Sequence, residues 1–241
     1  MAKEKTPRKK RIRRLLWRAI LLALLLLAAY FFWIFAHVLW WNYANPSETR
    51  FMARRLAIIR QHDPQAILKH QWVNYDQIST PFKRAVVAAE DDRFIEHHGF
   101  DWDGISHALE KNLKQGETIA GGSTITQQLA KNLFLSFERN VFRKGKEAMI
   151  TVIIETVWTK KRILEVYLNV AEWGDGVFGA EAAARHYYGV SAAQIDEAQA
   201  ARLAVMLPNP RRYEKVFPEY LATHADRVQS RMRYTVLPSE E

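Results

Sequence analysis

An uncharged apolar run near the N-terminus constrains this chain more than any other feature of its sequence. Residues 19–41 contain no Asp, Glu, Lys or Arg, and His37 is the only strongly polar side chain among them. A helix rises about 1.5 Å per residue, so the run reaches roughly 34 Å, which exceeds a bilayer core of about 30 Å. Aromatic residues suited to the lipid–water interfaces lie at its ends, Trp17 at one and Trp40 with Trp41 at the other. The sequence therefore predicts a single-pass transmembrane anchor over residues 19–41.

A strongly basic tail precedes this run and accounts for most of the net charge of the chain. Residues 1–18 hold nine Lys or Arg side chains against one acid, Glu4, and the whole sequence has a formal net charge of +9. Lys and Arg are enriched on the cytoplasmic side of membrane proteins, so the tail predicts a cytoplasmic N-terminus and places Asn42 onward outside the cytoplasm. Because membrane topology already explains these basic residues, we interpret the tail as a membrane-surface segment and expect no nucleic-acid partner.

A cleaved signal peptide is the alternative interpretation of this N-terminus. Its apolar core is usually about 7–15 residues long, and a small-x-small cleavage site follows it. The run in this sequence continues through bulky aromatic residues and offers no good cleavage site, which favours a retained anchor.

The rest of the chain predicts a linker followed by one mainly α-helical domain. In residues 42–65 we expect a juxtamembrane helix, capped by Ser47, whose mixture of apolar and Arg residues suits a lipid surface and packing on the domain equally well. Residues 66–241 show helical periodicity nearly throughout, with a short β-like piece around residues 71–75. The sequence contains no Cys, which excludes disulfides, thiolate metal ligands and cysteine nucleophiles.

Capping residues and glycines predict where the helices of this domain begin and end. Thr80 with Pro81 marks the start of a helix that runs to Gly99, since Thr is a good cap and Pro suits the first turn. We expect further helices at 123–132 with Ser123 as the cap, at 142–158, at 160–169 with Thr159 as the cap, and at 181–188 up to Gly189. A Ser191–Gln194 capping box predicts a last helix that stops at Pro208.

The first chemically suggestive segment lies at the end of the first of these helices. Glu90, Phe94 and His97 are spaced i, i+4 and i+7, which predicts one shared helix face. A carboxylate among apolar neighbours has its charged form disfavoured, which raises its pKa toward neutrality and suits a general base. The alternative is a capped helix whose acidic residues are merely solvated.

A second segment combines free backbone amides with polar side chains. Gly121-Gly122 precedes a helix N-terminus, where N–H groups without a helical partner can meet an anion. Thr124, Gln128 and Lys131 follow along one predicted face of that helix. The alternative is a glycine turn before an ordinary amphipathic helix.

A third segment, Arg143-Lys-Gly-Lys-Glu147, places three cations and one carboxylate within five residues. That composition suits a diphosphate and also offers a second acid. The alternative is that Arg143 and Glu147, spaced i, i+4, form a common surface ion pair.

Together these segments resemble glycosyltransferase family 51, the peptidoglycan glycan-strand polymerases. The motifs that match in order and spacing are Glu90-Asp-x-x-Phe-x-x-His-x-Gly99, Gly122-Ser-Thr-Ile-Thr-Gln-Gln128, Arg143-Lys-x-x-Glu147 and Lys160-x-x-Ile-Leu-Glu-x-Tyr-Leu-Asn169. The resemblance covers about residues 66–215 and is closest to the monofunctional biosynthetic transglycosylases of Gram-negative inner membranes. It implies a lysozyme-like, two-lobed, mainly α domain, held at the periplasmic face of the inner membrane by the N-terminal helix.

The resemblance also implies a substrate and roles for the motif residues. Lipid II would be polymerised into β-1,4-linked strands, with inversion at the donor MurNAc C1 and release of undecaprenyl diphosphate. Glu90 would be the catalytic base, and Glu147 a second catalytic glutamate that orients the leaving group or a metal. The residues that the resemblance implies for substrate binding are Asp91, Phe94, His97, Ser123, Thr124, Gln127, Gln128, Lys131, Asn132, Arg143, Lys144 and Lys146.

The expected cofactors and partners follow from the same resemblance. No cofactor is obligatory, although a divalent cation, Mg²⁺ or Mn²⁺, suits a diphosphate leaving group. The expected partners are lipid II, the nascent glycan strand, the bilayer and other cell-wall synthesis or division proteins. No Ser is followed by Lys three residues later and Lys-Thr-Gly is absent, so we expect no transpeptidase activity. A polar segment with a central glycine, residues 114–119, predicts a mobile flap.

Two other functions are compatible with a membrane-tethered helical domain. A lysozyme-like glycosidase or lytic transglycosylase also uses a Glu in a helical cleft, but it would leave the basic and Gly-Gly-Ser-Thr segments without a role. A single-pass scaffold that recruits cell-wall proteins would make the four matched motifs coincidental.

Overall fold

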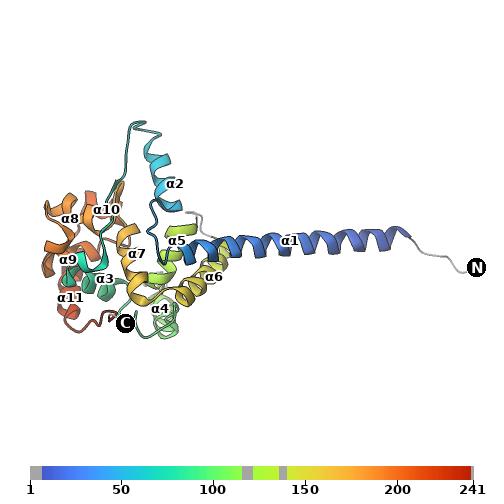
Figure 1. The fold of residues 1–241 in the computed structure, drawn as a ribbon. Helices are drawn as coiled ribbons and strands as arrows, with labels where there is room; N and C mark the ends of the chain where they lie inside the picture. Colours follow the sequence, from blue (N-terminus) through green and yellow to red (C-terminus); the bar gives the residue numbers. More distant parts are fainter. Residues whose placement is uncertain (1–6, 116–121, 136–139, 240–241) are drawn as a thin grey trace, which may run out of the picture.

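The computed structural model describes residues 7–115, 122–135 and 140–239, and it shows a long helix that projects from a head formed by the rest of the chain (Figure 1). The projecting helix is α1, Pro7–Trp40. Within the described ranges it is the one helix long and apolar enough to cross a membrane, with a mean hydropathy of 2.6 in its most apolar window. Because α1 begins at Pro7, the basic residues that follow Pro7 continue the predicted anchor as one helix. Most of the predicted flap, residues 116–119, lies outside the described residues.

The last turns of α1 belong to the core of the head. Ile34 and Val38 are fully buried, whereas the first two-thirds of the helix is exposed. The indole Nε1 of Trp158 donates to the carbonyl oxygen of Val38 at 2.7 Å. The guanidinium of Arg162 donates to backbone carbonyl oxygens within residues 41–44. These bonds fix the end of the anchor to the head.

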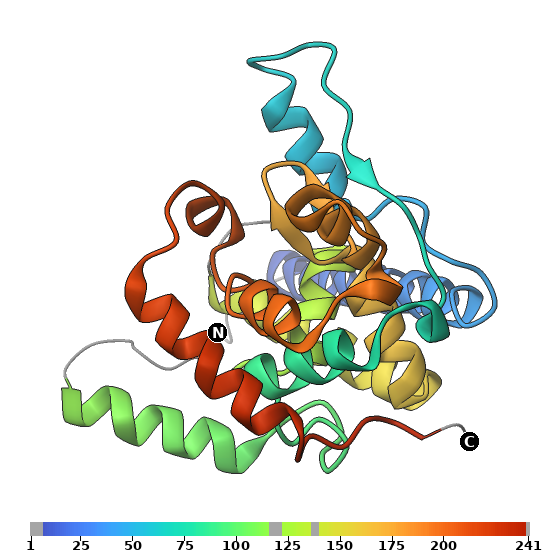
Figure 2. The ribbon, with the colours of Figure 1, turned by 90° about the vertical axis from the view of Figure 1, so that its left-hand side faces the viewer.

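Ten further α-helices form the head within the described ranges. Their bounds are α2 Arg50–Ile59, α3 Thr80–Glu90, α4 Trp102–Gln115, α5 Ile125–Phe134, α6 Val141–Val157, α7 Lys160–Val170, α8 Ala180–Tyr188, α9 Glu197–Ala204, α10 Pro210–Lys215 and α11 Glu219–Met232. α3, α9 and α11 pack on one another at the side of the head away from α1, whereas α5, α6 and α7 pack together next to α1 (Figures 1 and 2). The mainly α fold predicted from the sequence is confirmed, and its helices form two groups.

A small sheet joins distant parts of the head. β1 (Lys69–His70) pairs in parallel with β3 (Val177–Phe178), and β3 pairs in antiparallel fashion with β2 (Glu172–Gly174), which gives the order β1-β3-β2. The β-like piece predicted around residues 71–75 is therefore displaced toward the N-terminus. The strands are too short to make an independent layer, and they hold the segment after α2 against the start of α8.

The end of α3 differs most from the sequence prediction, because this helix stops at Glu90. Asp91 leaves the helical conformation, with φ −164° and ψ 71°, and its carboxylate accepts a hydrogen bond from the backbone N–H of Ile125 at 3.0 Å. Short acidic side chains compete in this way with a continuing helix. Phe94 then turns into the core, where it is fully buried. The prediction that Glu90, Phe94 and His97 share one helix face is wrong.

The loop after α3 ends at a glycine that no other residue replaces without strain. Gly99 has φ +86°, in the left-handed region that favours glycine. A Cβ at this position would lie 2.6 Å from Cγ2 of Thr151 on α6. The loop can therefore pack closely on α6 only because Gly99 has no side chain.

Three predicted N-caps lie one or two residues before or after the observed caps. The observed caps, which accept a first-turn N–H, are Thr49 for α2, Ser79 for α3 and Thr124 for α5, in place of Ser47, Thr80 and Ser123. For α5 the choice follows from a capping box with Gln127. The Ser191–Gln194 box is present but closes only a 3-10 turn, and Asp196 caps α9 instead. The predicted cap of α7, Thr159, and the predicted end of α8 before Gly189 are confirmed.

The juxtamembrane helix α2 packs on the head. Met52 and Arg55 are buried, and Arg55 Nε donates to Glu172 Oε1 of β2 at 2.9 Å. Of the two interpretations left open by the sequence, the structure supports packing on the domain.

Candidate active site

A half-buried carboxylate, that of Glu90, lies at the C-terminal end of α3 and faces α5. Gln128 Nε2 donates to Glu90 Oε2 at 2.6 Å. Burial raises the pKa of Glu90, and the charge of Asp91 adds to this, whereas the hydrogen bond from Gln128 and the charge of Lys131 lower it. Burial is the largest of these influences, so the carboxyl group holds a proton more readily than an ordinary Glu does.

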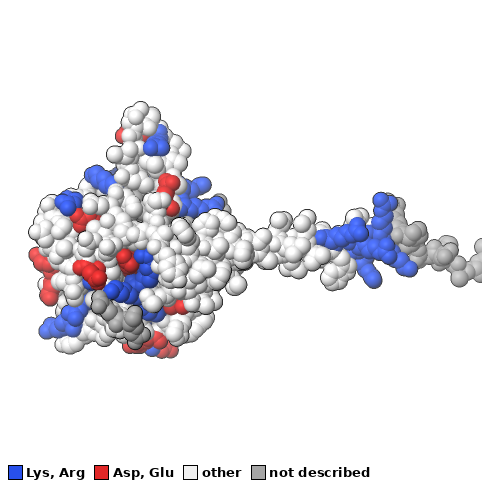
Figure 3. Space-filling model, in the orientation of Figure 1, with Lys and Arg blue, Asp and Glu red and all other residues white. Residues whose placement is uncertain are grey.

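Lys131 lies near this carboxylate, and a second glutamate with two further cations lies near Lys131. Glu147 on α6 is only 3% exposed, and its two carboxylate oxygens accept from Arg143 Nη1 and Lys144 Nζ, each at 2.5 Å. Lys131 on α5 is close enough to Glu90 and Glu147 for both charges to raise its pKa, while burial, the largest influence, lowers it. Figure 3 shows Lys and Arg side chains gathered in the middle of one face of the head, beside acidic side chains. Because Glu147 is buried, its pair with Arg143 is not the solvated surface pair considered in the sequence analysis.

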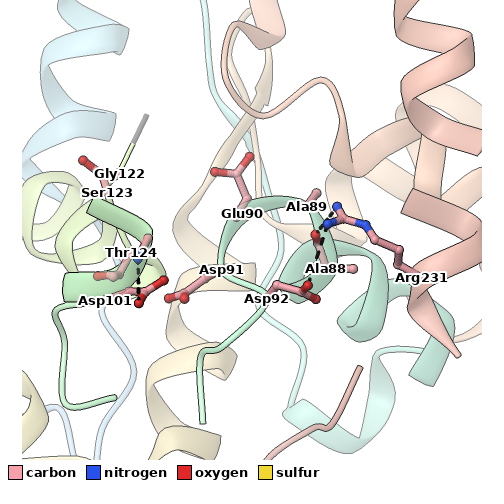
Figure 4. A pocket seen from close by; sticks show the side chains of 11 residues that line it. Ala88, Ala89, Glu90, Asp91, Asp92, Asp101, Gly122, Ser123, Thr124 and Arg231 are labelled. Carbon is pink, nitrogen blue, oxygen red and sulfur yellow. Dashed lines mark hydrogen bonds and ion pairs between the residues drawn. The ribbon is translucent and has the colours of Figure 1, made fainter. Parts of the chain in front are cut away.

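A polar cavity of about 170 Å³ opens beside Glu90 (Figure 4). Three acidic side chains, Asp91, Asp92 and Asp101, line it together with Arg231 of α11. Arg231 reaches across to α3, where Nη2 donates to the carbonyl oxygen of Ala88 at 2.8 Å and Nη1 lies 3.7 Å from Asp92 Oδ2. Gly122, Ser123 and Thr124 also line this cavity, so this part of the Gly-Gly-Ser-Thr segment borders the space next to Glu90.

A second cavity of about 340 Å³ begins at Gln128 and extends toward α2 and α10. Its polar lining comes from α5, α7, β2 and the start of α10, and consists of Gln128, Lys131, Asn132, Tyr167, Glu172, Asn209 and Arg211. Glu90 lines the first cavity and Gln128 lines the second, so their hydrogen bond joins the linings of the two cavities.

Two residues of the first motif hold the loop after α3 in place. Gly99 N–H donates to His97 Nδ1 at 3.1 Å, so the proton of the neutral ring is on Nε2, which donates to Asp91 Oδ1 at 2.8 Å. The other Asp91 oxygen accepts from Ile125, as described above. His97 thus supports Asp91, and Asp91 joins the loop to the N-terminus of α5.

Three further motif residues are engaged within the fold. Phe94 is buried in the core, with Lys160 Nζ 4.6 Å from its ring centre. Thr124 caps α5, and its hydroxyl donates to the carbonyl oxygen of Gly99 at 2.8 Å. Gln127 completes the capping box, since its Oε1 accepts from Thr124 N at 3.1 Å. These contacts build the walls of the site.

The remaining candidates divide between the site and the anchor. Ser123 accepts from Lys144 Nζ at 3.4 Å and lines the first cavity, and Asn132 lines the second. Lys146 lies on another face of α6, with Nζ 5.4 Å from the ring centre of Tyr30 on α1. The structure thus brings Lys144 into the site and directs Lys146 to the anchor.

Comparison with known proteins identifies the family. A family model described as Transglycosylase matches residues 58–234 of this sequence. The chain belongs to the transglycosylase family. A relative from Azoarcus sp. (strain BH72) is 59% identical over 229 residues, which cover 95% of this chain and 99% of the relative. Relatives from Methylobacillus flagellatus and Janthinobacterium sp. (strain Marseille) are 58% and 52% identical and are covered over their full length. All three are named biosynthetic peptidoglycan transglycosylase.

The match confirms the family predicted from the four motifs and, with the helical structure, the lysozyme-like fold class. It extends the transglycosylase region beyond residues 66–215 in both directions. The additional C-terminal part includes Arg231, which no motif in the sequence marked. Tyr167 lies inside the fourth motif and Arg211 directly follows a Pro-Asn-Pro segment, so both had a signal that the sequence analysis left unused.

Proposed function

We propose that this transglycosylase polymerises lipid II into β-1,4-linked glycan strands, with Glu90 as the general base. The observation that carries the proposal is a half-buried carboxylate whose hydrogen bond to Gln128 joins the linings of two cavities, with Lys131 close enough to act on it electrostatically. Polymerisation needs two sugars bound on either side of one proton acceptor, and this arrangement offers that.

The bond-forming step uses the basicity of Glu90. An acceptor 4-hydroxyl is a weak nucleophile near neutral pH, so its proton passes to the Glu90 carboxylate while its oxygen attacks C1 of the donor sugar. A carboxylate whose pKa burial has raised is a stronger base than an exposed one. Attack from the face opposite the diphosphate inverts the configuration at C1.

The bond-breaking step needs positive charge. The C1–O bond breaks with its electron pair, which leaves on undecaprenyl diphosphate as an anion. We assign Lys131, Arg143 and Lys144 to the departing diphosphate. Lys131 interacts electrostatically with Glu90, and the other two cations donate hydrogen bonds to Glu147. Glu147 in this proposal organises the cations instead of exchanging a proton.

A divalent cation has no ready-made ligand set near these residues. In the described part of the chain, no group of three or more His, Asp or Glu side chains is arranged to hold a metal ion. Both oxygens of Glu147 already accept from Arg143 and Lys144. We therefore derive no step through a metal, and turnover after extraction with a chelator tests whether Mg²⁺ or Mn²⁺ contributes.

We further propose that α1 spans the inner membrane with its N-terminus in the cytoplasm and the head in the periplasm. In addition to α1, the adjacent helix α6 exposes Val141, Phe142, Met149 and Val152, an apolar face next to the anchor. Lipid on that side of the head would bring the diphosphate of a membrane-bound substrate close to the cations of α6. Because the chain has no Cys, the single variants Lys10→Cys and Ser230→Cys test the topology with a membrane-impermeant maleimide. Labelling of intact spheroplasts at residue 230 alone supports the proposal, and labelling at residue 10 alone contradicts it.

Replacing Glu90 by Gln tests the proposed base. The variant keeps the side-chain volume but cannot accept a proton, so we expect glycan-strand formation from labelled lipid II to fall by at least about 10³-fold while lipid II still binds. Glu96→Gln is the matched control, because Glu96 lies in the following loop and its exposed carboxylate binds Arg93. Strand growth by Glu90→Gln at near wild-type rate would remove Glu90 from this role.

The same assay separates the competing functions. Strands formed from lipid II support a polymerase, fragments released from added glycan strands support a lytic enzyme, and neither product supports a scaffold. The expected absence of transpeptidase activity is tested by digesting the strands with a muramidase, since peptide cross-links between the resulting fragments would contradict it.

A further inference from the structure

We propose that Tyr167 is a positioning residue that sets the orientation of the Gln128 side chain and thereby presents an N–H donor to Glu90. The inference rests on the proposed function of Glu90 and concerns a residue that does not itself contact the reacting atoms. Three helices contribute to the arrangement, since Tyr167 is on α7, Gln128 on α5 and Glu90 on α3.

Two hydrogen bonds in series connect the three side chains. The Tyr167 hydroxyl donates to Gln128 Oε1 at 3.0 Å, and Gln128 Nε2 donates to Glu90 Oε2 at 2.6 Å. Tyr167 is only 1% exposed, so water does not compete for its hydroxyl. Burial, followed by the nearby charges of Glu90 and Asp91, raises the pKa of Tyr167 well above its ordinary value, so the phenol keeps its proton.

The phenol proton decides which end of the amide faces the carboxylate. A Gln side chain offers an acceptor at Oε1 and donors at Nε2, and the two ends can exchange by rotation about the last bond. With Oε1 toward Tyr167, both the phenol proton and the Glu90 carboxylate are satisfied. With the amide reversed, the phenol proton loses this acceptor and the amide oxygen faces a carboxylate, which is repulsive.

The orientation of the amide controls how strongly Glu90 holds a proton. A donor directed at the carboxylate stabilises the charged form and opposes the effect of burial on the pKa. Loss of the phenol proton would allow the reversed amide, whose oxygen accepts from a protonated Glu90 and so favours the form that cannot act as a base. Tyr167 therefore keeps Glu90 ionised at the pH of the reaction.

The arrangement gives the fourth sequence motif a role in the site. Within that motif, Lys160 Nζ binds Glu155 at 2.9 Å and Asn169 binds the backbone of Val73, so both serve the fold. Tyr167 is the member of the motif that lines the second cavity. Its hydroxyl links the packing of α7 on α5 to the proton affinity of the base on α3.

Tyr167→Phe in the full-length chain tests the inference. We expect kcat for lipid II polymerisation to fall about tenfold at neutral pH, KM to change less than about twofold, and the acidic limb of the pH–kcat profile to move to higher pH. Raising the pH should recover most of the lost rate, because it restores the Glu90 carboxylate. A lower kcat with an unmoved acidic limb would overturn the proposal and leave Tyr167 a purely structural residue.

Two controls separate positioning from loss of stability. Tyr75→Phe removes the hydroxyl of another largely buried Tyr, which has no hydrogen-bond partner in the described part of the chain, and we expect its acidic limb to stay in place. In a Gln128→Ala background, Tyr167→Phe should have no further effect on the limb, because Tyr167 acts through Gln128. Additive effects of the two substitutions would contradict the proposed chain.

A measurement without turnover keeps this inference distinct from the proposed function. The carboxyl ¹³C signal of Glu90 in the detergent-solubilised full-length protein, assigned with Glu90→Gln, should titrate at higher pH in Tyr167→Phe than in wild type. Equal titration in the two proteins refutes the role of Tyr167 even if Glu90 is the base. A shifted titration supports that role even if Glu90→Gln retained polymerase activity and the proposed function failed.

Discussion

Replacing Glu147 by Gln removes the charge that holds two cations on α6 but preserves the size of the side chain. The carboxylate is 3% exposed and accepts from Arg143 and Lys144, whose side chains are 17% and 49% exposed. Removing one partner of a fully buried ion pair costs about 3–5 kcal/mol, and water at the two cations reduces this, so we expect about 2 kcal/mol of lost stability. For a chain of this size that corresponds to a fall in Tm of about 4–8 °C.

The same substitution should affect activity far more than its stability cost explains. Without Glu147 the two cations lose their fixed positions, and removal of a preorganised charge of this kind typically costs about 10²–10³-fold in rate. Glu147 is also the largest of the charges that raise the pKa of Lys131. That pKa therefore falls further in the variant, and the alkaline limb of the kcat/KM profile for lipid II moves to lower pH.

Glu155→Gln is the matched comparison for this experiment. Glu155 lies two turns further along α6, has a buried carboxylate, and accepts from Lys160 at 2.9 Å and from Thr126 at 2.5 Å. We expect a similar loss of Tm, measured by thermal unfolding in detergent, without a shift of the alkaline limb. If the two variants lost the same activity with the same pH profile, Glu147 would have no role in the site beyond packing.

Three further predictions follow from the fold and the site. The wild-type pH profile of kcat/KM should be bell-shaped. Its acid limb reflects protonation of Glu90, whose pKa lies above the ordinary Glu value of 4.5, and its alkaline limb reflects deprotonation of Lys131, whose pKa lies below the ordinary Lys value of 10.5. A profile without either limb contradicts the assignments. Gly99→Ala, which adds a Cβ where α6 packs, should destabilise the protein by about 2–4 kcal/mol in a denaturant titration. Deletion of residues 1–28 should leave a folded head with a nearly unchanged Tm. Deletion of residues 1–41 also removes the buried tip of α1 and should lower Tm by more than about 10 °C, the effect expected for losing two buried aliphatic side chains. Equal Tm values for the two deletions would show that the tip does not stabilise the head.

The sequence predicted the anchor, the helical class and most helix positions because these depend on local patterns. The helices at 141–157 and 160–170 differ from their predicted bounds by one residue, since periodicity and a Thr cap specify them within a single segment. The end of α3 could not be predicted in this way. Whether the chain continues as a helix past Glu90 depends on a hydrogen bond from the backbone N–H of Ile125 to the carboxylate of Asp91, which is formed only when two distant segments meet.

The candidate site shows the same division between local and long-range information. The four motifs predicted that Glu90, Gln128 and Glu147 share one site, because their spacing matched a known family, and Lys131 was predicted on the same helix face as Gln128. Arg231 escaped notice, since its contact with Ala88 joins residues far apart in the chain and no pattern around it is distinctive. Motif membership also did not distinguish residues that line the cavities from those, such as Phe94 and Gln127, that hold the walls.

The buried tip of α1 gives the anchor a second role under the proposed function. A flexible tether would only raise the concentration of the head at the membrane surface. Here Trp158 at the end of α6 binds the backbone of Val38, and Arg162 of α7 binds the residues that follow the anchor. The helices fixed to the anchor are thus the ones that carry Glu147 and Tyr167, which sets the height and tilt of the site relative to α1. A lipid-linked diphosphate has a defined depth in the bilayer, so a rigid connection places the cations of α6 at one distance from it, which a flexible linker of the same length does not do.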